Sequence, residues 1–123
     1  MSRKPVILVV DDDAPILTLM RSLLREFGFE ARTATSGAAA IEAARAEAPD
    51  LVLLDKNMPG MSGGDVIRAL RSDVGLENVP ILLLTGDPVA PQEIAELGAN
   101  GTVQKPFDIQ DLLAQIRTHV GVL

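Results

Sequence analysis

Polar side chains follow four short runs of strand-forming residues in this sequence, each at the point where the run ends. The residues concerned are three consecutive acids, a fourth acid, a hydroxyl and an amine: Asp11, Asp12, Asp13, Asp55, Thr85 and Lys105. Carboxylates gathered at one place repel one another, and a hard cation relieves that conflict. A carboxylate beside a cation can accept a phosphoryl group as an acyl phosphate. The pattern therefore indicates metal-dependent phosphoryl transfer to an aspartate.

Four residues form the expected metal site. Mg²⁺ prefers near-octahedral oxygen coordination and keeps several waters, so one or two carboxylates and a backbone carbonyl suffice. Asp12 and Asp55 are the expected direct ligands, and Asp11 could act through a water molecule. Asn57, two residues after Asp55, could supply its backbone carbonyl. The sequence thus predicts a Mg²⁺ site, with Mn²⁺ as the alternative ion.

The phosphoryl group needs a nucleophile and partners for its oxygens. Asp55 is the expected phosphoacceptor. Lys105 would contact the phosphoryl oxygens as a point charge, and Thr85 would donate its hydroxyl to another of them. Gly86, next to Thr85, leaves room for the group. Each expected partner comes from a different strand.

The strands that must position these residues are short. Continuous apolar runs of this length fit strands buried on both faces of a parallel sheet, and weaker runs fit edge strands. The strong runs are residues 6–10, 51–54 and 81–84, and the weak ones are residues 30–35 and 102–104. The sequence therefore predicts five strands.

Five stretches of helical spacing alternate with the strands. The residues that mark them are Ile16, Met20, Leu23 and Phe27, with Gly28 as a stop; Ile41 and Ala44, after Ser36 and before Pro49; Val66, Ile67 and Leu70; Ile94 and Leu97, before Gly98; and Leu112, Leu113, Ile116 and Val120, after Asp108. Asp13 is expected only to cap the first helix. Strand followed by helix, five times, predicts a doubly wound α/β domain whose site lies at the carboxyl ends of the strands.

Composition narrows the function classes. The chain has 123 residues, 47% of them hydrophobic, which fits one domain spanning residues 1–123. A net charge of −6 disfavours direct binding of nucleic acid, and no tyrosine or tryptophan is present to stack on bases. The absence of cysteine excludes disulfides and thiolate sites. No membrane span or targeting segment is apparent, so a cytoplasmic location is expected.

Four motifs together resemble the response regulator receiver domains of two-component signalling. They are Asp11-Asp12-Asp13 after Val10; Asp55 with Met58, Pro59 and Gly60; Thr85-Gly86 after Leu84; and Lys105-Pro106-Phe107. Each motif is weak alone, but their order and separation are specific. The resemblance covers about residues 4–120.

The resemblance implies a flavodoxin-like fold, with a five-stranded parallel sheet in the order 2-1-3-4-5 and five helices. It implies transfer of phosphoryl from a phosphohistidine on a sensor histidine kinase or histidine phosphotransfer protein to Asp55. It also implies Mg²⁺ dependence through Asp11, Asp12, Asp55 and Asn57. Thr85 and Lys105 would sense the phosphoryl group. The last two helices and the last strand would pass the signal to a downstream protein or output domain, so the chain would be a phosphoacceptor that promotes its own phosphorylation and dephosphorylation.

Thr102 is the one departure from the family pattern. The family often has an aromatic switch residue three positions before the lysine, and Thr102 occupies that position here. We expect the phosphorylation chemistry to be unaffected and the output change to differ.

Three other functions fit this sequence less well. A phosphatase resembling the haloacid dehalogenases would need an acid where Asn57 stands. A nucleotide- or flavin-binding domain would need a phosphate loop after the first strand, where three acids stand instead. A degenerate receiver that only binds proteins would not need the complete set of acids, threonine and lysine.

Overall fold

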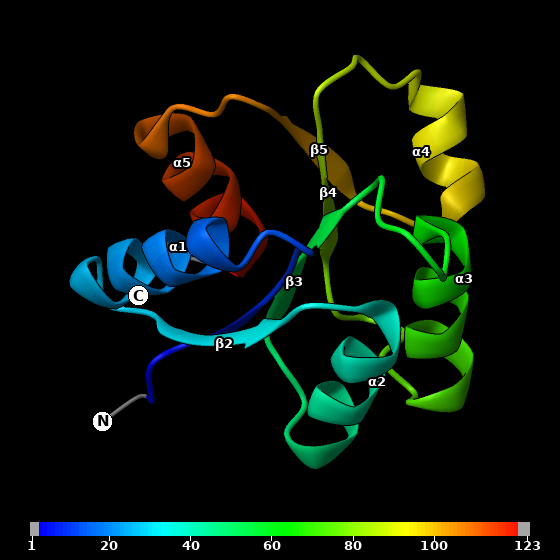
Figure 1. The fold of residues 1–123 in the computed structure, drawn as a ribbon, viewed down its shortest axis with the longest axis horizontal. Coiled ribbons are helices and arrows are strands. Elements are labelled where there is room, and N and C mark those ends of the chain that lie inside the picture. The colour runs from blue at the N-terminus through cyan, green and yellow to red at the C-terminus, as the bar shows by residue number, and fades with distance from the viewer. Residues whose placement is uncertain (1–2, 121–123) are drawn as a thin grey trace.

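The computed structural model describes residues 3–120. Five parallel strands form one sheet in the order β2-β1-β3-β4-β5. Helices α1 and α5 cover one face, and α2, α3 and α4 lie on the other (Figure 1). The elements are β1 (Val6–Val10), α1 (Ala14–Glu26), β2 (Glu30–Ala34), α2 (Gly37–Ala46), β3 (Leu51–Asp55), α3 (Gly63–Arg68), the π-helical turn η1 (Ala69–Asp73), β4 (Ile81–Thr85), α4 (Pro91–Leu97), β5 (Gly101–Gln104) and α5 (Ile109–Val120). The predicted doubly wound fold and strand order are confirmed.

The three central strands are buried on both faces. In β1, Ile7 and Val9 belong to the core under α1 and α5, whereas Leu8 and Val10 belong to the core under α2 and α3. This alternation follows from the two-residue period of a strand. It explains why β1, β3 and β4 are apolar until their carboxyl ends, where the polar side chains begin. Within residues 3–120, no helix is long and apolar enough to cross a membrane.

The helix starts follow the predicted caps. The Asp13 carboxylate accepts a hydrogen bond from the backbone N–H of Ile16 at 3.3 Å, and Ser36 caps α2 in the same way. The Asp108 carboxylate accepts the N–H of Gln110 at 2.7 Å at the start of α5. Side-chain acceptors satisfy N–H groups that a first helical turn leaves unpaired. The caps at Asp13 and Asp108 set where α1 and α5 begin, shortly after the site residues Asp12 and Lys105.

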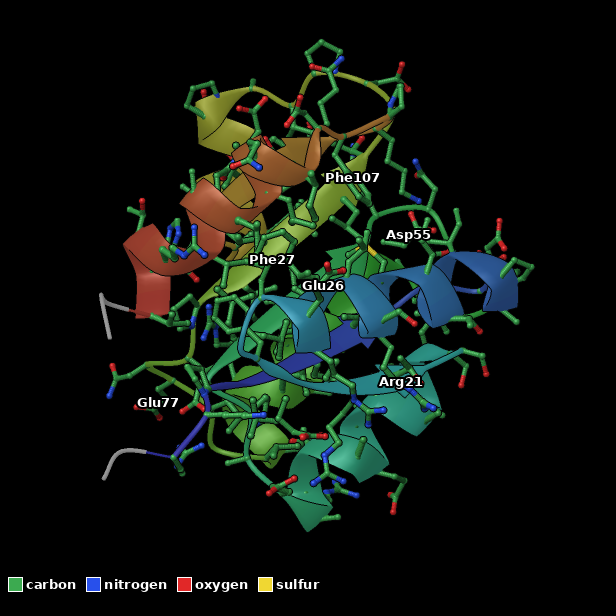
Figure 2. The ribbon with its side chains drawn as sticks, turned by 90° about the vertical axis from the view of Figure 1, so that its left-hand side faces the viewer. Arg21, Glu26, Phe27, Asp55, Glu77 and Phe107 are labelled. Atoms are coloured by element: carbon green, nitrogen blue, oxygen red, sulfur yellow. The ribbon has the colours of Figure 1, made fainter. Side chains whose placement is uncertain are left out.

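Helix α1 differs in detail from its sequence pattern. Its fully buried residues are Leu17, Met20 and Leu24, whereas Leu23 is half-buried. Phe27, which the spacing placed in the helical stripe, lies beyond the last turn and is exposed (Figure 2). The helix ends one residue earlier than that pattern requires, so the apolar spacing identified the helix and its core residue Met20 but missed Leu17 and Leu24.

Candidate functional site

The two acidic segments meet because β1 and β3 are neighbours. Val10 pairs in register with Leu54, so the residues that follow them, Asp11 and Asp55, emerge side by side at the carboxyl edge of the sheet. Figure 2 shows Asp55 where its strand ends, on the same side of the molecule as Phe107 and away from Glu77. The parallel sheet thus brings together acids that are 44 positions apart in sequence (55 − 11).

Three carboxylates form a compact acidic cluster. One oxygen from each of Asp11, Asp12 and Asp55 lies within 4.8 Å of the others. Asp11 is 1% and Asp55 7% exposed, whereas Asp12 is exposed to solvent. Three hard oxygen donors with one open side suit a divalent cation that keeps some of its water. The donor set therefore fits Mg²⁺ or Mn²⁺ as the sequence predicts.

Lys105 reaches over β4 into the acidic cluster. Its Nζ lies 3.0 Å from Asp11 Oδ2 and 3.5 Å from Asp55 Oδ2. Burial disfavours the ammonium, but its hydrogen bond to Asp11 and the charge of Asp55 outweigh that effect and raise the pKa of Lys105. Lys105 therefore stays charged and balances part of the negative charge.

The Asp55 carboxylate is held between opposing influences. Burial is the largest and raises its pKa, and the neighbouring charge of Asp11 acts in the same direction. The N–H of Asn57, which donates to Asp55 Oδ1 at 3.1 Å, and the Lys105 ammonium only partly offset this rise. The groups around Asp55 thus offset only part of the cost of its negative charge. A bound cation would offset the rest.

Thr85 lies at the end of β4, next to β3, but its hydroxyl is engaged in a local turn. Its Oγ1 donates to the backbone carbonyl of Asp87 at 3.0 Å and accepts the Asp87 N–H at 3.2 Å. The side chain is buried. Thr85 thus lies at the expected edge of the sheet, while its hydroxyl closes a turn at the start of the β4–α4 loop that no sequence pattern predicts.

Thr102 is half-buried in β5, where it pairs in register with Leu83. It lines a hollow of about 630 Å³ between β5 and α5, together with Phe107 and Ala114. The position expected to carry an aromatic residue is therefore beside open space in this chain.

A family model of the response regulator receiver domain matches residues 7–117. The DNA-binding response regulator MtrA of Mycolicibacterium paratuberculosis is 43% identical over 116 residues, which are 93% of this chain and 50% of that protein. Hybrid signal transduction histidine kinase D of Dictyostelium discoideum is 38% identical over 92% of this chain, but the match covers only 7% of the kinase. The chain thus spans about half the length of MtrA and a small part of the kinase.

Solved structures of the same fold include two receiver-type proteins that cover nearly all of this chain. The chemotaxis protein CheY4 of Vibrio cholerae superposes with a TM-score of 0.88 at 32% identity, covering 94% of this chain and 98% of that one. The receiver domain of sensor histidine kinase PA1611 of Pseudomonas aeruginosa has a TM-score of 0.86 at 25% identity, covering 97% and 99%. The PA1611 structure holds a magnesium ion coordinated in its active-site cleft.

Proposed function

Because this chain belongs to the response regulator receiver domains of two-component signalling, we propose that Asp55 is the residue that takes the phosphoryl group. One observation carries the proposal: one carboxylate oxygen from each of Asp11, Asp12 and Asp55 lies within 4.8 Å of the others, and Lys105 contacts two of these acids. We propose residues 1–123 as a single receiver domain on the same basis.

The chain's own groups define the transfer step. The Asp55 carboxylate forms a new O–P bond while the P–N bond of a phosphohistidine breaks, and the imidazole leaves with a proton from solvent. Asp11, Asp12, Asp55 and the backbone carbonyl of Asn57 would hold Mg²⁺, which when bound neutralises charge on the phosphoryl oxygens. Lys105 moves from the carboxylates to a phosphoryl oxygen. The result is an acyl phosphate on Asp55, and its later hydrolysis returns the free carboxylate.

Thr85 would report the new group. Its hydroxyl would exchange the Asp87 carbonyl for a phosphoryl oxygen, which opens the turn at the start of the β4–α4 loop. The proposed output surface is formed by α4, β5 and α5, and Thr102 lies on it without the bulk of an aromatic ring.

The proposed partners lie on both sides of this step. A sensor histidine kinase or a histidine phosphotransfer protein supplies the phosphoryl group, and a downstream protein or output domain receives the signal. MtrA is named a DNA-binding regulator, and the chain spans half of it. The expectation that no nucleic acid is contacted therefore remains a prediction about residues 1–123 alone.

Intact-protein mass spectrometry tests the phosphoacceptor. With acetyl phosphate and Mg²⁺, the wild type gains the mass of one phosphoryl group, and Asp55→Asn gains none. Asp73→Asn makes the same change at an exposed position of η1 and should be labelled like the wild type. Full labelling of Asp55→Asn would move the site to another residue.

A further inference from the structure

Helix α4 contributes no buried residue to the fold. It has seven residues, and its apolar side chains Ile94 and Leu97 are only half-buried. Its N-cap, Ala90, provides no side-chain hydrogen bond to the first turn. Since neither a buried apolar stripe nor a cap fixes this helix, its position depends on the contacts at its two ends.

The C-terminal end of α4 is firmly anchored. Gly98 ends the helix in the left-handed conformation with φ of 83°, and its carbonyl accepts from the Arg71 guanidinium at 2.9 Å. Arg71 also donates to the Asn100 side chain at 2.9 Å. Asn100 is bonded to Ile81 at the start of β4, through its backbone N–H at 2.8 Å and its side-chain oxygen at 2.9 Å. Hydrogen bonds through Asn100 thus hold the C-terminal end of α4 to β4.

Arg71 is itself held by the loop that precedes β4. Besides its bonds to the end of α4, its guanidinium donates to the backbone carbonyls of Leu76, at 2.7 Å, and Val79. Its acceptors are neutral, so the bonds do not depend on the protonation of an acid. The π-helical turn η1 therefore places a fixed anchor beneath the C-terminal end of α4.

The N-terminal end of α4 is held differently. Lys56 Nζ lies 3.1 Å from Glu93 Oε2, and the two side chains are 27% and 48% exposed. Ion pairs this exposed are weak and easily exchanged. Lys56 directly follows Asp55, and its backbone N–H donates to Leu84 at 2.9 Å, one residue before Thr85. A weak ion pair thus connects the first turn of α4 to the strand that carries the proposed phosphoacceptor.

We propose that the Lys56–Glu93 ion pair acts as a latch that holds the first turn of α4 near the end of β3 in the unphosphorylated protein. A phosphoryl group on Asp55 breaks this ion pair, and α4 then pivots about its anchored end at residues 98–100. The trigger rests on the proposed function of Asp55. Phosphorylation replaces the −1 charge of the Asp55 carboxylate by an acyl phosphate whose outer oxygens carry about −1.5 to −2, so the negative charge near Lys56 grows and competes with Glu93 for its ammonium. Opening of the Thr85–Asp87 turn also frees the loop that leads into α4. Both effects act on the weakly held end.

Amide exchange in the free protein tests the latch without any phosphorylation. The N–H of Ile94, which donates to the carbonyl of Ala90 at 3.1 Å, reports the first turn. In Glu93→Gln it should exchange about two- to fivefold faster than in the wild type, as an exposed ion pair allows. The amide of Asn100, at the anchored end, should be unchanged. Glu96→Gln, the same change on the same helix, should match the wild type.

Charge reversal separates the ion pair from any other role of these residues. The double variant Lys56→Glu with Glu93→Lys should restore the wild-type exchange rate of Ile94, whereas either single reversal should raise it. Wild-type exchange in Glu93→Gln, or failure of the double reversal to restore protection, would overturn the latch.

Beryllofluoride with Mg²⁺, a stable mimic of the phosphoryl group, tests the trigger. In the wild type the mimic should raise the exchange rate of the Ile94 amide to the rate that Glu93→Gln shows without the mimic. In Glu93→Gln the mimic should raise this rate little further. An unchanged rate in protein that fluorine NMR shows to be loaded would overturn the trigger. Failure to load would reject the phosphoacceptor site and the trigger with it, whereas the latch in the free protein stands or falls on Glu93→Gln alone.

Discussion

Lys105 forms an ion pair with Asp11, the most buried acid of the site, across the full width of β4. The Nζ–Oδ2 distance is 3.0 Å, and the Asp11 side chain is only 1% exposed. The same ammonium lies 3.5 Å from Asp55. One lysine thus balances two carboxylates, in the place where a cation and a phosphoryl group would share the charge.

Removal of the Lys105 ammonium should make the stability of the fold depend more strongly on bound Mg²⁺. We expect Lys105→Met to lower the free energy of unfolding by about 1–3 kcal/mol without metal, less than for a fully buried pair because the lysine is partly exposed. Added Mg²⁺ should stabilise this variant more than the wild type. Urea unfolding in chelator and in Mg²⁺ measures both, with Lys4→Met as the exposed control. Equal Mg²⁺ effects in variant and wild type would contradict the charge-balancing role.

Neutralising an acid of the cluster should have the opposite effect. Asp12→Asn relieves repulsion among three carboxylates, so the metal-free protein should gain about 0.5–1 kcal/mol in its free energy of unfolding. The variant should also lose most of its Mg²⁺ affinity in calorimetric titration. Asp13→Asn keeps a good helix cap and should retain that affinity. Unchanged affinity in Asp12→Asn would remove Asp12 from the ligand set.

The sequence was most informative where one strand delivers one side chain. Asp11, Asp55 and Lys105 come together because parallel strands end at one edge, and the strand periodicity was clear in the apolar runs. Gly28 marks the end of helix α1 to within two residues, but the apolar spacing extends the helical stripe to Phe27, one residue beyond the last helical residue, Glu26. The Lys56–Glu93 pair depends on the orientation of α4, which the loop 86–90 sets and no local pattern records.

At the opposite edge of the sheet, Asp50 should give an acid-sensitive contribution to stability. Burial disfavours its ionisation, but the Arg3 guanidinium and the Val6 N–H together outweigh this and lower its pKa. Asp50→Ala leaves that N–H without its 2.7 Å acceptor and should cost about 1–3 kcal/mol at pH 7.

The pH dependence follows from the direction of this shift. A lowered folded-state pKa stabilises above the unfolded pKa of about 3.9, and the contribution is lost as pH falls through the folded value. The difference between wild type and Asp50→Ala should therefore narrow from about pH 5 downward in unfolding titrations. Glu77→Ala, which removes an exposed carboxylate, should show little effect at any pH. A constant difference down to pH 2 would contradict the assignment.

Gly37 should tolerate no side chain, although alanine favours helices. A Cβ there would lie 2.7 Å from Val66 Cγ2 and 3.1 Å from Met61. Gly37→Ala should therefore cost about 1–3 kcal/mol of unfolding free energy. At Gly64 the nearest atom is the flexible end of Leu97 at 3.2 Å, so Gly64→Ala should cost less. Equal effects of the two variants in denaturant unfolding would show that α2 and α3 can separate freely.

The most direct test of the account locates the phosphoryl group chemically. Borohydride reduces an acyl phosphate to an alcohol, so labelling with acetyl phosphate and Mg²⁺ followed by reduction should convert Asp55 to homoserine, as peptide mass spectrometry would show. Without Mg²⁺ the conversion should fall sharply. Homoserine at Asp11 or Asp12 instead, or equal conversion of Asp55 with the metal chelated, would contradict the central claim.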